Sequence, residues 1–237
     1  MRDDICTIPV SEVFEHNDGC PICRMRDTIE ERMTDYILGD AMMEPDVRIE
    51  TNKTGFCEHH YNNMMSRRGR LQLALMLQTH INEINGEIFK KKLFNTDSKK
   101  TGNAKNITDS CFICSKIEWG LSRMIETVYR CYETQKDFRD MFNSQSMFCL
   151  PHYERLLGGA SKRNMKSYYP EFSENLNRIT GEYSKSLYDD LSKYCTMYDY
   201  RSRDGETDWG NSRDAVERSV NKLRGWCVGK EPNPEEK

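Results

Sequence analysis

The sequence predicts a mainly α-helical protein, because apolar residues recur at spacings of three and four along most of the chain. Alternating β-branched and polar residues, which are typical of half-buried strands, are nearly absent. The chain also contains two similar halves, each with one C-x-x-C and one C-x-x-H motif, which predict a duplicated helical unit built around a metal site. Hydrophobic residues make up 37% of the 237 residues, which is enough for a lean core.

Two helices are predicted in the first half. The first follows the initial C-x-x-C, and its apolar face is formed by Met25, Ile29, Met33 and Ile37. The second is longer, and its apolar face is formed by Leu73, Leu77, Ile81, Ile84 and Ile88. Between them, residues 46–51 alternate in polarity and predict a short strand or an extended loop. Residues 95–110 are rich in Lys, Asn, Asp and Thr, and we expect them to form a loop that joins the halves.

Four helices are predicted from the second C-x-x-C to the C-terminus. The first follows the second C-x-x-C, with an apolar face of Ile117, Leu121, Met124, Val128 and Tyr132. Gly158 and Gly159 are expected to end a short helix before a long one, whose apolar stripe comprises Phe172, Leu176, Ile179, Tyr183, Leu187, Leu191, Tyr194 and Tyr198. A C-terminal helix is predicted at about 212–228, with the stripe Val216, Val220, Leu223 and Cys227. We expect the charged tail beyond it to be disordered.

The order and spacing of the matches between the halves predict two copies of one unit. In each half a C-x-I-C motif precedes an F-C-x-x-H-Y motif, and the gap between them is 33 residues in the first half and 34 in the second. A further match of Asn82–Glu87 with Asn177–Glu182 extends the copies to about 16–93 and 107–198. We therefore expect a single pseudo-twofold domain made of these two repeats.

The ten cysteines and their spacing predict metal binding. No apolar segment typical of a secretory signal follows Met1, so we expect a cytoplasmic protein, in which thiols stay reduced. Zinc is commonly held in a tetrahedron by three cysteines and one histidine. Each half supplies one such set, and we expect two zinc ions per chain. The predicted ligands are Cys20, Cys23, Cys57 and His60 for the first ion, and Cys111, Cys114, Cys149 and His152 for the second.

The spacing of both motifs suits a shared ion. Residues three apart lie on one face of a helical turn, so each motif directs two side chains to one point. Helix N-termini also favour thiolates through their free N–H groups. His59 is expected to be a surface residue, because alignment of the halves places His60 on the metal. His80 is expected to be a hydrogen-bonded histidine at a helix interface.

Three other readings of these motifs stay open. An iron–sulfur cluster uses the same types of ligand. The C-P-I-C sequence at Cys20 resembles a redox dithiol, although the βαβ context of that motif is missing. The basic clusters Ser66–Arg70 and Ser161–Lys166 can contact nucleic-acid phosphates, although the net charge of −3 gives no general reason to expect such a partner.

The sequence favours a non-enzymatic role without deciding the matter. It contains no Ser-His-Asp pattern, Gly-rich phosphate loop or H-E-x-x-H motif that indicates catalysis. The absence of a long apolar run also speaks against a membrane span. We therefore expect an interaction or regulatory module with structural metal sites and an unidentified protein partner.

Several segments carry a resemblance to a known family: Ile8–Val10, Cys20–Cys23, Met43–Arg48, Gly55–Cys57 with His60, and Leu75–His80. On these residues the chain resembles a bacterial family known as domain of unknown function 6062. The resemblance covers nearly the whole chain. It implies a cytosolic protein of anaerobic Gram-positive bacteria, and it implies no activity.

Overall fold

The computed structural model describes residues 8–89, 96–160, 165–199 and 208–225. These residues are mainly α-helical and include no strand, which confirms the mainly α-helical part of the predicted fold class. The helices of the described ranges are α1 (Ile8–Phe14), α2 (Pro21–Leu38), α3 (Pro45–Thr54), α4 (Glu58–Ser66), α5 (Arg70–Ile84), α6 (Asp97–Thr108), α7 (Phe112–Thr134), α8 (Lys136–Asn143), α9 (Leu150–Gly159), α10 (Tyr169–Tyr198) and α11 (Ala215–Arg224). No helix of this part of the chain is both long and apolar enough to cross a bilayer.

The described residues form two compact units. Unit 1 contains the chain up to Asp27 and from Ser122 onward, and unit 2 contains Thr28–Leu121. Helix α2 begins in unit 1 and ends in unit 2, whereas α7 begins in unit 2 and ends in unit 1. Each unit therefore contains the start of one long helix and the end of the other. The two predicted repeats do not coincide with the units, and the duplication stays a prediction.

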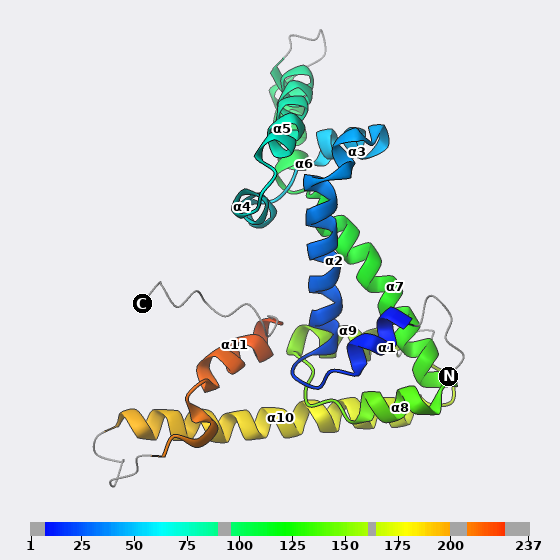
Figure 1. The fold of residues 1–237 in the computed structure, drawn as a ribbon, viewed down its shortest axis with the longest axis vertical. Helices are drawn as coiled ribbons and strands as arrows, with labels where there is room; N and C mark the ends of the chain where they lie inside the picture. Colours follow the sequence, from blue (N-terminus) through cyan, green and yellow to red (C-terminus); the bar gives the residue numbers. More distant parts are fainter. Residues whose placement is uncertain (1–7, 90–95, 161–164, 200–207, 226–237) are drawn as a thin grey trace. The chain divides into compact units, whose positions relative to one another are not determined.

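Unit 1 has an aromatic core. The ring centroid of Phe142 in α8 lies 5.0 Å from those of Phe148 and Phe172, and 5.6 Å from that of Phe14. All four rings are at most 2% exposed, so their packing brings α1, α8 and the start of α10 together. Figure 1 shows α8 beside α10, and α11 packed on the other part of α10. Because Cys149 directly follows Phe148, this core also fixes the position of that cysteine.

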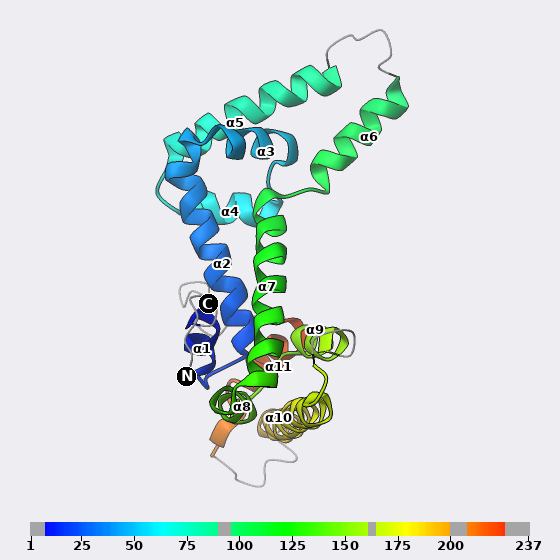
Figure 2. The same cartoon turned by 90° about the vertical axis from the view of Figure 1, so that its right-hand side faces the viewer.

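Unit 2 has an aliphatic core with two aromatic residues. Its buried members are Ile37, Leu38, Ala41, Phe56, Met64, Leu73, Met76, Phe112 and Ile113. They come from α2, α4, α5, the start of α7 and the connecting segments, so one cluster joins elements that are distant in sequence. Figure 2 shows α3 lying against α5 in this unit.

The segment predicted to be a strand or an extended loop is helical. Pro45 occupies the first turn of α3, where its missing N–H and fixed φ suit a helix start. Val47 packs against the core and Thr51, one turn later, is 2% exposed, whereas Ile49 points outward. The polarity pattern was too short to distinguish the period of a strand from that of a helix. The contacts of this segment with α5 favour the helix.

The predicted joining loop also contains a helix, α6. Thr96 caps its N-terminus by accepting a hydrogen bond from the backbone N–H of Lys99 at 3.4 Å. None of its residues is buried, which explains why its sequence contains no apolar stripe that predicts a helix. The prediction of a loop over 95–110 is therefore wrong for the described residues.

The second half contains its predicted helices in order, together with α8, which was not predicted. Helix α9 ends at Gly159 and α10 extends over 30 residues, which confirms a short helix before a long one. Helix α11 is present, but the predicted apolar stripe faces outward, since Val216, Val220 and Leu223 are exposed. Ala215 and Lys222 are buried instead, because they face α9 and α10. Cys227 and the predicted tail lie outside the described residues.

A glycine turn connects α3 to the first C-x-x-H motif. Gly55 has a φ of 59°, and a Cβ placed on it would lie 2.6 Å from Nε2 of His80. His80 is buried and its Nδ1 donates to the carbonyl oxygen of Asn52 at 2.7 Å, as expected for an interfacial histidine. The backbone N–H of Phe112 donates to the Gly55 carbonyl at 3.0 Å. The turn therefore holds the chain just before Cys57 against the start of α7.

We expect the substitution Gly55→Ala to destabilise the protein by about 2–4 kcal/mol, because it adds both an unfavourable φ and a clash with His80. Gly181→Ala in α10 is the matched control, since a Cβ there meets nothing within 4 Å and should stabilise the helix by about 0.5–1 kcal/mol. Urea denaturation followed by circular dichroism measures both. An unchanged midpoint for Gly55→Ala would show that the turn is not constrained.

Candidate metal centres

Site 1, in unit 1, consists of Cys20, Cys23, Cys149 and His152, whose ligand atoms all lie within 4.8 Å of one another. Nδ1 of His152 is 3.6, 3.3 and 3.1 Å from the Sγ atoms of Cys20, Cys23 and Cys149. Cys20 and Cys23 lie at the start of α2, and Cys149 is the N-cap of α9, with His152 in its first turn. Two helix starts thus direct four side chains to one point.

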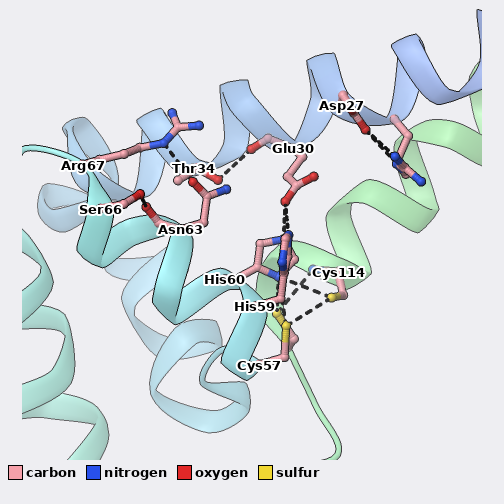
Figure 3. A network of polar contacts seen from close by, with 12 residues as sticks. Asp27, Glu30, Thr34, Cys57, His59, His60, Asn63, Ser66, Arg67 and Cys114 are labelled. Carbon is pink, nitrogen blue, oxygen red and sulfur yellow. Dashed lines mark hydrogen bonds and ion pairs between the residues drawn. The ribbon is translucent and has the colours of Figure 1, made fainter. Parts of the chain in front are cut away.

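Site 2, in unit 2, consists of Cys57, His60, Cys111 and Cys114, and its ligand atoms also lie within 4.8 Å of one another. Nδ1 of His60 is 3.1, 3.3 and 3.4 Å from the Sγ atoms of Cys57, Cys111 and Cys114. Cys57 is the N-cap of α4, and Cys111 and Cys114 lie at the start of α7. Figure 3 shows His60 and the sulfur atoms of Cys57 and Cys114 facing one another.

The structure brings together all eight predicted side chains, but their predicted grouping by halves is wrong. Each site combines the C-x-x-C of one half with the C-x-x-H of the other. The physical reason lies in the helices that follow the C-x-x-C motifs. Helix α2 has 18 residues and extends about 27 Å, so it carries the chain away from Cys23 before Cys57 is reached. Helix α7, with 23 residues, does the same between Cys114 and Cys149.

The sulfur atoms are close together without being bonded. Cys23 and Cys149 are 3.6 Å apart at Sγ, and Cys57 and Cys114 are 3.8 Å apart. A disulfide requires about 2.05 Å, so both pairs are free thiols. Cys131 is buried and Cys195 is exposed, and neither belongs to a cluster of the described residues. Cys6 and Cys227 lie outside those residues.

The neighbouring groups in each site shift the pKa values of its thiols. In site 1, the hydrogen bond with Cys20 raises the pKa of Cys149 to about 12. In site 2, burial works to raise the pKa of Cys111, but hydrogen bonding to His60 outweighs it and lowers the pKa to about 6. Burial and the neighbouring Cys111 raise the pKa of Cys114. One thiolate in each group therefore opposes ionisation of the next, and a bound cation would remove this conflict.

Helix α11 covers site 1. Gly225, the C-cap of α11, has a φ of 70°, and a Cβ on it would lie 3.0 Å from Sγ of Cys149. Arg26 donates to the Gly225 carbonyl at 2.6 Å, and the buried Lys222 donates from Nζ to the carbonyl oxygen of Phe148 at 2.9 Å. Burial lowers the pKa of Lys222, and the thiols of Cys149 and Cys20 act in the opposite direction. Sequence reasoning missed Lys222 of α11 and its C-cap Gly225, since nothing in their spacing relates them to the cysteines.

Site 2 has a carboxylate beside its histidine. Oε1 of Glu30, on α2, is 2.7 Å from Nε2 of His59 and 3.4 Å from Nε2 of His60 (Figure 3). Burial acts to lower the pKa of His60, but Cys111, Glu30 and Cys57 together raise it to about 10. Glu30 is 8% exposed, and it faces the ring nitrogen of His60 that points away from the sulfur atoms. Carboxylates in this place orient metal-bound histidines.

His59 is an exposed residue, as expected, but it is not free of partners. Its side chain is 65% exposed and forms an ion pair with Glu30. Glu30, His59 and His60 themselves form a third group with ligand atoms within 4.8 Å of one another. Sequence reasoning missed Glu30, because it lies 27 residues before Cys57 on a helix that was assigned only a packing role.

We expect Glu30→Gln to weaken metal binding at site 2 by about 10-fold or more, because the amide no longer orients and polarises His60 as a carboxylate does. Glu31→Gln is the matched control, since Glu31 is the exposed neighbour on the same helix. Competition with a chromophoric chelator measures the affinity of each variant. Equal metal affinities for the two variants would show that Glu30 does not contribute to metal binding at site 2.

The two sites differ in their access to solvent. In site 1 all four residues are buried, with at most 7% exposure. In site 2 His60 is buried, Cys57 and Cys111 are partly exposed, and Cys114 is exposed. The same set of donor groups is thus enclosed in unit 1 and open on one side in unit 2.

Together, the fold and the clusters define a mainly helical protein with two groups of three cysteines and one histidine that can hold metal ions. The profile of the family of unknown function DUF6062 matches residues 1–230. The chain therefore belongs to this family, which confirms the resemblance found in the sequence motifs. No curated protein and no solved structure matches the chain.

Proposed function

We propose that the protein binds two zinc ions, one in each site, and that it serves as a helical scaffold for a protein partner in the cytoplasm. The observation that carries the proposal is the arrangement of three sulfur atoms and one nitrogen atom around each of two points. Zinc–ligand bonds of about 2.3 Å to sulfur and 2.0–2.1 Å to nitrogen give tetrahedron edges of about 3.5–3.8 Å. The sulfur–sulfur separations of 3.6 and 3.8 Å match these edges, and the nitrogen–sulfur separations of 3.1–3.6 Å equal them or are slightly shorter.

A structural role is supported by the number and burial of the ligands. Four protein ligands leave no coordination position for a substrate, whereas catalytic zinc sites keep one open. Site 1 is also covered by α11, and Lys222 places a buried positive charge beside its thiols. Since three thiolates exceed the charge of one zinc ion, this lysine offsets the remaining negative charge.

A single ion suits the sites better than an iron–sulfur cluster. The donor atoms of a cluster surround several iron and sulfide ions, and they must therefore be spaced more widely than those around one ion. The ligand atoms of each site all lie within 4.8 Å of one another, which suits a single ion. The third cysteine and the histidine in each group support a metal site over a simple redox dithiol.

The proposed duplication is supported by the similar construction of the sites. In both, a C-x-x-C motif starts a long helix and a C-x-x-H motif starts a short one. The capping cysteines have nearly the same backbone conformation, with φ and ψ of −75° and 166° at Cys57 and −70° and 157° at Cys149. We infer that the repeats exchange partners, so that each metal joins both copies.

A protein partner is favoured over a nucleic acid. In the first basic cluster, Arg67 forms an ion pair with Asp35 and is thereby partly engaged. The second basic cluster lies mostly outside the described residues. The net charge of −3 leaves no general attraction to phosphates. Binding of duplex DNA or RNA that weakens steeply with salt would favour the nucleic-acid alternative.

Metal analysis of the full chain purified without oxygen tests the proposal. We expect two equivalents of zinc per chain and no visible absorbance. Iron with sulfide and a brown colour would show that the protein binds an iron–sulfur cluster and not zinc. A folded protein without metal would show that the two groups are not metal sites.

A further inference from the structure

We propose that site 2 is an oxidation site for peroxides, in which Cys114 is oxidised, Cys57 forms a disulfide with it, and the metal is released while site 1 keeps its own. The inference rests on the proposed function, because it concerns the zinc-bound thiolates of the two sites. It goes beyond that function because it assigns oxidation by peroxide to site 2 and resistance to this oxidation to site 1.

Access to solvent selects site 2. Oxidation of a thiolate requires contact with the oxidant, so susceptibility follows exposure and thiolate character. Cys114 is exposed, whereas the three cysteines of site 1 are at most 7% exposed. Bound zinc keeps the thiols of both sites ionised, so exposure is the property that differs between them.

The cover of site 1 explains its expected resistance. The backbone of Gly225 lies so close to the thiols that an added Cβ would be 3.0 Å from Cys149 and 3.5 Å from Cys23. The hydrogen bond from Arg26 holds this glycine, and the bond from Lys222 to the Phe148 carbonyl holds the last turn of α11. This end of α11 therefore limits the access of a peroxide molecule to the sulfur atoms of Cys149 and Cys23.

Cys57 is a thiol within reach of Cys114, in the same group as Cys111. The Sγ atom of Cys114 lies 3.8 Å from that of Cys57, which is itself partly exposed. The two atoms must approach to about 2.05 Å to bond. Cys57 precedes α4 as its N-cap, and this end of the helix needs only a small displacement to bring the sulfur atoms together.

The reaction has two balanced steps. The Cys114 thiolate attacks one oxygen of hydrogen peroxide, the O–O bond breaks, and the products are a sulfenic acid and hydroxide, which takes a proton from solvent to become water. The Cys57 thiolate then attacks Sγ of Cys114, a disulfide forms, and a second hydroxide leaves and is protonated. Two thiolates supply the two electrons that reduce one peroxide to two water molecules. Only Cys111 and His60 would then remain to hold a zinc ion in site 2, so we expect its release.

Graded hydrogen peroxide added to the zinc-loaded full chain tests the inference. A chromophoric chelator measures zinc release, a sulfenic-acid trap followed by mass spectrometry locates the first oxidised cysteine, and non-reducing peptide mapping locates the disulfide. We expect release of one zinc per chain, trapping at Cys114, and a disulfide between Cys57 and Cys114. Reduction with a dithiol in the presence of zinc should restore the second equivalent.

Cys195→Ser is the control variant, because Cys195 is exposed but belongs to neither site, and zinc release should be unchanged in it. Release of both ions together, no release before the protein unfolds, or a disulfide between other cysteines would overturn the inference. The zinc content before peroxide separates the two proposals. Fewer than two ions at the start contradicts the proposed function, whereas two ions without selective release contradicts only the oxidation site.

Discussion

A double variant with Cys23→Ser and Cys149→Ser retains one metal ion per chain, whereas a double variant with Cys23→Ser and Cys57→Ser retains none. This is the expected result because Cys23 and Cys149 belong to the same site, so the first pair of substitutions damages only site 1. The second pair removes one ligand from each site. Serine hydroxyls are poor zinc ligands at neutral pH, so each damaged site loses its ion.

Metal analysis of the two variants, purified in parallel, checks the grouping directly. Both contain two Cys→Ser substitutions and share Cys23→Ser, so they differ only in the second position. If ligands were grouped by halves, the results would be reversed, with one ion in the Cys23/Cys57 variant and none in the Cys23/Cys149 variant. The Cys131→Ser variant should retain both ions, since Cys131 lies outside both sites.

Removal of both ions by a strong chelator should lower the midpoint of thermal unfolding by about 40 °C or more, or abolish the cooperative transition. Structural zinc contributes about 10 kcal/mol or more per site at neutral pH, and each kcal/mol corresponds to about 2–4 °C in a protein of this size. Each site joins helix starts that are far apart in sequence, such as Cys20 with Cys149 and Cys57 with Cys111. Without the ion, these helix starts are held only by the packing of a lean core.

Differential scanning fluorimetry and circular dichroism measure this effect. Added zinc should restore the original midpoint, whereas added magnesium should not, because magnesium prefers oxygen ligands in an octahedron. An unchanged midpoint after complete removal of the ions would show that the sites do not stabilise the fold.

Much of the helical structure was predictable because it depends on local patterns. The spacing of apolar residues located α2, α5, α7, α10 and α11 within a few residues. Two of the errors fall where that signal is absent or too short. Helix α6 has no buried residue, and α3 depends on its contacts with α5, so neither could be inferred from periodicity. The predicted apolar stripe of α11 is exposed, because a different face of the helix contacts α9 and α10.

The sequence by itself determined which residues can bind metal. Cysteine and histidine supply the donor atoms, and a spacing of three residues at a helix start brings two donors to one point, so both properties are local. Only the tertiary structure decided which pairs meet. Long helices separate the motifs of each half, and the unit cores bring Cys20 to His152 and Cys111 to His60. The same cores placed Glu30, Lys222 and Gly225 at the sites, because contacts between distant segments depend on packing and leave no trace in the spacing of residues.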